Sequence, residues 1–161
     1  MLVVSDTSPI INLATIGYLH LLPELFSEIV IPTAVFNEIA GPGNNEPGAQ
    51  ALKEAAWVKV LPVPTQPILP QLLHDLDKGE AEAIVLAIDL KATYILMDEA
   101  LGRKIALSYN LQPLGVLGML VLAKQRGLIE VVMPLMDRLK SEANFYIDSN
   151  LYQYIREIAN E

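Results

Sequence analysis

Two short apolar segments of this chain end in carboxylates. Residues 2–5 lead into Asp6, and residues 92–97 lead into Asp98 and Glu99. If both segments are strands of an open α/β sheet, their carboxyl ends meet at the edge where such sheets bind ligands. Carboxylate oxygens are the ligands that hard cations such as Mg²⁺ and Mn²⁺ prefer. The sequence therefore predicts an acidic site for a divalent cation.

Two further glutamates complete a candidate set. The set is Asp6, Glu38, Glu80 and Asp98, with Glu99 as an accessory member. Two ions about 3.5–4 Å apart clamp a phosphodiester and activate water for in-line attack, and carboxylates from several elements hold them. This chemistry needs several acidic residues and no protein nucleophile, and the chain offers that combination.

Each carboxylate also has a purely structural interpretation. Asp6 is a residue type that shapes strand-to-helix turns. Glu38 lies on a short helix, where a glutamate usually faces solvent, although its apolar neighbours Val35 and Ile39 place it near the buried edge. Both interpretations stay open at this point.

The later carboxylates differ in how well structure alone explains them. Asp77 and Glu80 have capping-box spacing, so Glu80 has a structural role available, and Glu82 is expected to face solvent. Glu99 suits the first turn of a following helix, where the helix dipole favours it. Asp98 ends a nearly all-apolar strand, and burying it there is costly without a metal or a hydrogen-bond donor.

Strands and helices alternate along the chain. Strands are expected over residues 2–5, 28–31, 57–61, 93–97 and 113–116. Helices are expected over residues 8–17, 19–26, 33–40, 49–56, 80–90 and 100–109, then one ending at Gly127, one over 130–141, and a last one capped by Asp148 or Ser149. Ser8 is expected to cap the first helix, residues 41–48 to form a loop, and the proline-rich residues 62–70 to form an extended connector. This alternation predicts a mostly parallel sheet covered on both faces.

Composition narrows the class of protein. The 161 residues fit a single domain, and no apolar run is long enough to cross a bilayer. The chain has no cysteine and shows no basic segment followed by an apolar one at its start, so we expect a cytoplasmic protein without a signal peptide. The net charge of −8 argues against a broad basic surface for nucleic acid. It does not exclude a nuclease, because bound metal ions reverse the local charge.

Four segments together resemble a known family. In order and spacing, residues 6–10, 35–39, 79–84 and 96–99 are similar to those of PIN-domain proteins. The resemblance covers residues 2 to about 130, and the tail is similar to a prokaryotic branch described as VapC-like or as predicted nucleic-acid-binding proteins. It implies a three-layer α/β/α Rossmann-like fold in one domain over 1–161, with a core over about 2–130 and a C-terminal helical extension over about 130–161.

The resemblance also implies an activity. It implies a Mg²⁺- or Mn²⁺-dependent endoribonuclease, the toxin of a toxin–antitoxin pair, which forms a homodimer and is blocked by a small antitoxin protein. Hydrolysis is expected to leave a 5′-phosphate and a 3′-hydroxyl. The acidic quartet carries over as the catalytic residues, with Asp6 and Asp98 as principal metal ligands. Glu80 and Glu99 follow as further ligands. Glu80 stands where many PIN nucleases have aspartate.

Supporting residues carry over as well. Ser8 is implied to orient Asp6 or a water molecule on the ion, and Asn12, one helical turn later, to face the same cleft. Arg103 is a candidate contact for a substrate phosphate; the alternative is a solvated helix face. Near the end of the chain lie four aromatic residues that either stack on bases or pack in a core or dimer, namely Phe145, Tyr146, Tyr152 and Tyr154.

Two other functions stay open. The first is a catalytically inactive PIN-like module that binds or regulates. The second is a small-molecule phosphohydrolase in which Asp6 is the nucleophile, although Ser8 stands where that class expects a second aspartate. A phosphoryl-aspartate would identify the second function.

Overall fold

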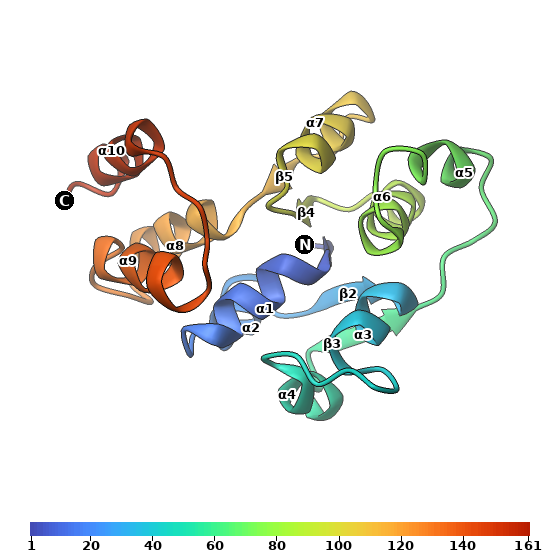
Figure 1. Cartoon of the computed structure of the whole chain (residues 1–161), viewed down its shortest axis with the longest axis horizontal. Helices are drawn as coiled ribbons and strands as arrows, with labels where there is room; N and C mark the ends of the chain where they lie inside the picture. The colour runs from blue at the N-terminus through green and yellow to red at the C-terminus, as the bar shows by residue number, and fades with distance from the viewer.

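The computed structural model of the protein describes all 161 residues and contains a five-stranded sheet. The strands are β1 (Val3–Ser5), β2 (Ile29–Pro32), β3 (Val58–Leu61), β4 (Tyr94–Leu96) and β5 (Pro113–Leu114). All of the pairings are parallel, and the strand order is β3-β2-β1-β4-β5 (Figure 1). The predicted parallel α/β sheet is therefore confirmed.

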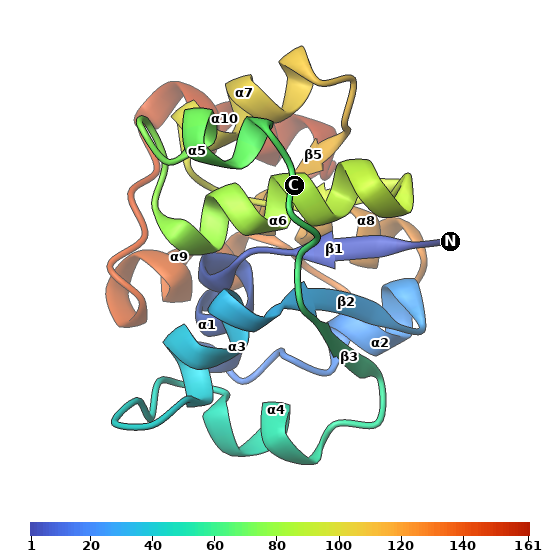
Figure 2. The same ribbon diagram turned by 90° about the vertical axis from the view of Figure 1, so that its right-hand side faces the viewer.

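Ten helices surround this sheet. They are α1 (Thr7–Thr15), α2 (Leu21–Phe26), α3 (Thr33–Ala40), α4 (Ala49–Glu54), α5 (Ile68–Leu72), α6 (Lys78–Leu90), α7 (Ala100–Ser108), α8 (Val116–Gln125), α9 (Met133–Glu142) and α10 (Ser149–Ile158). Helices α5, α6 and α7 lie on one side of the sheet, and α1, α2, α8 and α9 lie on the other (Figures 1 and 2). This is the three-layer α/β/α arrangement that the resemblance implied.

Alternating strand residues divide the core between the two faces. Side chains of consecutive strand residues point to opposite faces of a sheet. Val3 and Leu96 belong to the larger cluster, which includes residues of α1, α8 and α9. Val4 and Ile95 belong to the smaller cluster, which is built mainly on α6. The sheet is thus buried on both faces, and its strand ends are the exposed part.

Some element boundaries differ from the predictions. Helix α1 begins at Thr7, so Asp6 and not Ser8 occupies the N-cap position, and no side chain caps that helix. The strand predicted over 113–116 ends at Leu114, because Gly115 is the N-cap of α8. The connector predicted over 62–70 gives way to α5 at Ile68. At the chain end, Asp148 caps α10 as predicted, accepting a hydrogen bond from the Leu151 N–H.

None of the helices combines the length and the apolar composition that crossing a membrane requires.

Candidate active site

The strand order brings the two carboxylate-bearing strand ends together. Strand β1 lies between β2 and β4. Strands β2 and β3 follow on one side of β1, and β4 and β5 follow on the other side, so the strand order reverses at β1. Ser5 pairs with Leu96, and the Asp6 N–H donates a 2.9 Å hydrogen bond to the Leu96 carbonyl oxygen. Asp6 and the residues that follow β4 therefore meet at the topological switch point, where open α/β sheets bind their ligands.

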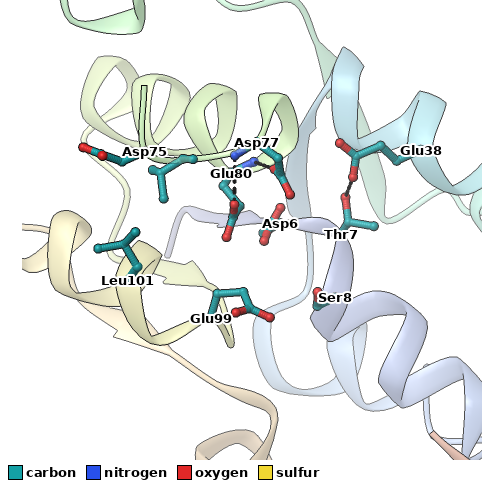
Figure 3. Close-up of a pocket in the computed structure, with 10 residues that line it drawn as sticks. Asp6, Thr7, Ser8, Glu38, Asp75, Asp77, Glu80, Glu99 and Leu101 are labelled. Atoms are coloured by element: carbon teal, nitrogen blue, oxygen red, sulfur yellow. Dashed lines mark hydrogen bonds between the residues drawn. The ribbon is translucent and has the colours of Figure 1, made fainter. Parts of the chain in front are cut away.

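An acidic cleft of about 370 Å³ opens at this point (Figure 3). Its lining residues are Asp6, Thr7, Ser8, Glu38, Asp75, Leu76, Asp77, Glu80, Glu99 and Leu101. Six of them carry carboxylates and none carries a cation. The three salt bridges of the chain pair other carboxylates, so no lysine or arginine neutralises this cleft. We call it the acidic cleft.

Asp6 is the most buried carboxylate of the acidic cleft. Its exposed fraction is 2 % because the ends of β1 and β4 enclose it. Burial raises the pKa of Asp6 to about 8, although the backbone N–H of Thr7 acts to lower it. The nearby carboxylates of Glu80, Asp77 and Glu38 raise it further. A bound cation would relieve both the burial and the repulsion.

Glu38 reaches the acidic cleft from α3 and is held there by two neighbours. The Thr7 hydroxyl donates a hydrogen bond to its Oε2 atom (Figure 3). A Cβ atom at Gly79 would lie 2.6 Å from its Oε1 atom, so the carboxylate occupies space that only glycine leaves open. Glu38 therefore faces the cleft and not bulk solvent.

Glu80 forms the predicted capping box and also lines the acidic cleft. Its Oε1 atom accepts a 3.0 Å hydrogen bond from the Asp77 N–H, and its own N–H donates to Asp77 Oδ1, which completes the predicted capping box. Its carboxylate also turns toward that of Asp6 (Figure 3). Burial raises the pKa of Glu80, although the Asp77 N–H acts to lower it. Capping therefore holds Glu80 in the acidic cleft.

Asp98 faces away from the acidic cleft, toward α8. Its Oδ1 atom accepts a 2.8 Å hydrogen bond from the Val116 N–H, and its Oδ2 atom accepts a 3.4 Å bond from the Asn12 amide. Burial raises the pKa of Asp98, although the bond from Val116 acts to lower it. Asn12 thus contacts Asp98, and Glu99 is the residue after β4 that lines the cleft.

Arg103 belongs to the surroundings of Asp98. A Cβ atom at Gly115 would lie 2.5 Å from Arg103 Nη1 and 3.0 Å from Asp98 Oδ1, so both side chains pass over that glycine. Arg103 is half-buried there, and its charge lowers the pKa of Asp98. It is not simply a residue of a solvated helix face.

The position of Glu82 differs from the predicted one. It was expected to face solvent, yet it is 7 % exposed and its Oε1 atom accepts a 3.3 Å hydrogen bond from the Ala34 N–H. Ala34 lies in the first turn of α3, where backbone N–H groups lack partners within the helix. Glu82 therefore ties α6 to the start of the helix that carries Glu38.

Sequence reasoning missed two groups of cleft residues. Thr7 was not singled out, and its contact with Glu38 joins positions 31 residues apart, which no local pattern shows. Asp75 and Asp77 also line the acidic cleft. Asp77 was predicted only as a helix cap, which it is.

The donor set fits a hydrated Mg²⁺ or Mn²⁺ ion. Asp6, Glu38, Glu80 and Glu99 offer only oxygen ligands, the kind these hard cations prefer. No three of the carboxylates converge closely enough to ligate one ion together. Mg²⁺ usually keeps several waters and binds through one or two carboxylates, so three convergent ligands are not required.

Comparison with known families gives one match. A family model for PIN domains, DUF3368, matches residues 2–161. It therefore includes α9 and α10 as well as the core over about 2–130 that the sequence motifs cover. Searches of curated proteins and of solved structures found no match.

Proposed function

This chain belongs to the PIN-domain family, and on that premise we propose that it is a Mg²⁺- or Mn²⁺-dependent endoribonuclease. PIN domains are generally nucleases and typically use divalent metal ions. The observation that carries the proposal is the burial of Asp6 in a cleft of six carboxylates with no compensating cation. A buried carboxylate among like charges is unfavourable unless a cation or a proton neutralises it, and a cation that displaces the proton gains the whole cluster as its counter-charge.

The carboxylates of the acidic cleft would hold the ion. Asp6 is the anchor, and Glu80 Oε2 and the Glu99 carboxylate lie on either side of the same cleft. Asp98 adjoins this set and provides a ligand if its carboxylate leaves the Val116 N–H. A bound divalent ion supplies Lewis-acid activation of water and neutralises charge on the phosphate.

The remaining residues position water and substrate. Thr7 fixes Glu38 through Oε2, which leaves Oε1 to accept a proton from the attacking water. Ser8 offers a hydroxyl to the cleft. The water oxygen attacks phosphorus in line with the departing 3′-oxygen, the bond from phosphorus to that oxygen breaks, and the 3′-oxygen takes a proton from solvent. The products are a 5′-phosphate and a 3′-hydroxyl.

RNA cleavage with matched carboxamide variants tests this function. The wild type is expected to cut a labelled single-stranded RNA in Mg²⁺ or Mn²⁺, and Asp6→Asn to lower the rate roughly 100-fold or more. Asp75→Asn is the control, because it makes the same chemical change in the same cleft at a carboxylate that points away from Asp6 (Figure 3). Cleavage that persists unchanged in Asp6→Asn contradicts the proposal.

The alternatives give different results in the same preparation. A wild type that binds Mn²⁺ and RNA without cutting supports the inactive binding module. A trapped phosphoryl-aspartate at Asp6 supports the small-molecule phosphohydrolase, since water attack forms no such bond.

We extend the proposal to a toxin of a toxin–antitoxin pair, acting on cellular RNA as a homodimer that a small antitoxin blocks. The support is the resemblance of the motifs to VapC-like proteins. Expression of the wild type is expected to arrest bacterial growth, and Asp6→Asn to relieve the arrest. Equal growth of both strains at equal protein levels contradicts the toxin assignment.

A further inference from the structure

We propose that a second groove, between α7 and α10, binds the nucleobase next to the scissile phosphate by stacking it on Tyr146 and Tyr154. This inference rests on the proposed function, because it takes the occupant to be single-stranded RNA that enters from the acidic cleft. It assigns a binding role to Tyr146 and Tyr154, which the catalytic proposal does not use.

The groove has the size and lining of a ligand site. Its volume is about 420 Å³, and most of its lining is apolar, from α8, α10 and the segment before α10. Volumes of 300–1,000 Å³ with a mainly apolar lining and a few polar groups are typical of small-molecule sites. Figure 1 shows α7 and α10 on either side of the link between β5 and α8. We call it the aromatic groove.

One short segment separates the aromatic groove from the acidic cleft. Glu99 and Leu101 line the acidic cleft, whereas Asp98 and Ala100 line the aromatic groove. The two hollows therefore share the wall formed by residues 98–101. A nucleotide whose phosphate lies in the acidic cleft would therefore have only this short wall between its phosphate and the aromatic groove.

Two tyrosines in the aromatic groove are exposed in a way that packing does not explain. Tyr146 is 84 % exposed and Tyr154 is 56 % exposed, and both line the groove. The neighbouring Tyr152 instead packs against the larger core cluster, and its hydroxyl donates to Asp137. Phe145 lines the groove but also packs against that cluster. Exposed aromatic rings beside a polar site are typical platforms for stacking bases of single strands.

The position of one cationic side chain favours a nucleotide. Arg103 is the one cationic side chain among the residues that line the two hollows, and it lines the aromatic groove two residues after the shared wall, within reach of a phosphate that crosses it. Gly115 and Gly118 also line the aromatic groove, but the side chains of Arg103, Asp98 and Leu114 fill the space beside them. The surface on which a base would stack is therefore the tyrosine side of the groove.

A binding experiment separates stacking from charge. The probes are 5′-fluorescein decauridylate and an abasic ribose-phosphate oligomer of equal length, titrated by fluorescence anisotropy in Ca²⁺, with intactness checked on a denaturing gel. Tyr146→Ala and Tyr154→Ala are each expected to weaken decauridylate binding roughly 5- to 150-fold. Binding of the abasic oligomer is expected to be weak already and to stay unchanged in both variants.

Two control variants keep the test specific. Tyr146→Phe retains the aromatic face and is expected to bind decauridylate as the wild type does. Leu107→Ala truncates a side chain of α7 that is 59 % exposed but lies outside the aromatic groove, and it is expected to change nothing. Circular dichroism verifies folding of each variant. No loss in either alanine variant, equal losses for both oligomers, or no binding by the wild type overturns the inference.

The test also distinguishes other outcomes. Bis(p-nitrophenyl) phosphate has no nucleobase, so its Mn²⁺-dependent hydrolysis by wild type and Asp6→Asn reports on the proposed function alone. Absence of hydrolysis with tyrosine-dependent decauridylate binding means that the nuclease proposal fails and the base site stands. If Tyr146→Ala lowers the sedimentation coefficient and leaves oligomer binding unchanged, a second copy of the chain covers the groove and the inference is wrong.

Discussion

Asp6 is the carboxyl of the acidic cleft that burial makes hardest to ionise. Its carboxyl is almost fully enclosed and has a pKa of about 8, mainly because burial disfavours the charged form. Without a cation, the folded protein therefore keeps a proton there that the unfolded chain gives up. With a cation, the proton must leave, so metal binding and proton release are linked.

The first prediction concerns stability and pH in the absence of metal. The pKa of Asp6 is raised from 3.8 to about 8, so the folded state binds more protons between these values. The contribution of Asp6 to the free energy of unfolding is therefore complete below about pH 4 and falls by up to about 1.4 kcal/mol per pH unit until about pH 8. Urea unfolding with a chelator measures this slope between about pH 5 and pH 8. Asp6→Asn is expected to reduce this slope and Asp75→Asn to keep it, and the part that remains in Asp6→Asn comes from Glu80 and Asp98, whose pKa values are also raised. Equal slopes in all three proteins contradict the account.

The second prediction concerns the space that Gly79 leaves for Glu38. A Cβ atom there would meet Glu38 Oε1 at 2.6 Å, and the flexible carboxylate is the part that moves. Gly79→Ala is expected to lower RNA cleavage as Glu38→Gln does, while the stability of α6 stays equal or rises by up to about 1 kcal/mol. Cleavage rates and urea unfolding of the two variants test this. Wild-type cleavage by Gly79→Ala means that the position of Glu38 does not matter.

For single residues, the sequence predicted which carboxylates lie near the site better than it predicted which way their side chains point. Asp6 and Glu80 were identified because a strand end and a capping box are local patterns, and both patterns are present. The orientation of Asp98 depends on donors 18 and 86 residues away in the chain, Val116 and Asn12. Such partners follow only from the packing of α1 and α8 against the sheet.

Among the elements, α6 and α3 depend on each other through Glu82. Glu82 satisfies the Ala34 N–H at the start of α3, which no side chain of its own caps. Helix α3 in turn carries Glu38. The buried link therefore supports both the core and the acidic cleft.

The third prediction tests this link. Glu82→Ala leaves the Ala34 N–H without its partner in a buried place and is expected to cost about 1–3 kcal/mol of unfolding free energy. Lys78→Ala is the control, because Lys78 lies 4.0 Å from Glu82 and is 72 % exposed, so its loss is expected to cost less than about 1 kcal/mol. Urea unfolding of both variants decides the matter. Equal costs would mean that Glu82 contributes through its ion pair within α6, and not through a link from α6 to α3.

Helix α10, which forms one side of the aromatic groove, is fastened by the last residue of the chain. The Glu161 carboxylate accepts hydrogen bonds from the N–H groups of Val132 and Met133, at 2.7 and 3.0 Å, and from Lys124 Nζ at 2.9 Å. Burial acts to raise the pKa of Glu161, but these bonds outweigh it and leave the pKa lowered. The charged form is therefore the one that holds α10 near α9.

The fourth prediction follows from that shift. A lowered pKa in the folded state gives stability that is present above the ordinary value of 4.5 and is lost as the pH falls through the folded-state value. Glu161→Gln is expected to speed amide hydrogen exchange in α10 at neutral pH, because the charge-assisted bonds weaken. Acidification is expected to speed that exchange in the wild type relative to the variant, after correction for intrinsic rates. Identical protection of α10 in both proteins contradicts this role of Glu161.

Element prediction succeeded where local patterns decide and failed where tertiary contacts do. The five strands and the caps at Asp77 and Asp148 follow from apolar runs and from capping residues. Helix α5 was missed because a proline-rich stretch favours an extended chain, yet its Leu72 is buried in the core cluster under α6. Glu82 was misjudged because the donor that it satisfies lies on another helix.

At the scale of the whole molecule, six carboxylates lie together at the edge of the sheet where open α/β folds bind ligands. The strand order of the parallel sheet reverses at β1, which leaves a hollow at the ends of β1 and β4. Six carboxylates line this hollow. The sequence predicted this fold and this acidic edge, because buried strands ending in carboxylates are visible in it. It did not predict that a second hollow shares the wall at residues 98–101, since that depends on where α10 packs.

The most direct test of the account is a Mn²⁺ titration followed by electron paramagnetic resonance, which needs no knowledge of the RNA target. The wild type is expected to bind Mn²⁺ specifically. Asp6→Asn is expected to bind it at least about tenfold more weakly, whereas Asp75→Asn binds as the wild type does. A parallel titration of Asp98→Asn shows whether Asp98 is a ligand. Specific binding that survives in Asp6→Asn, or no specific binding by the wild type, would contradict the claim that Asp6 anchors a cation in the acidic cleft.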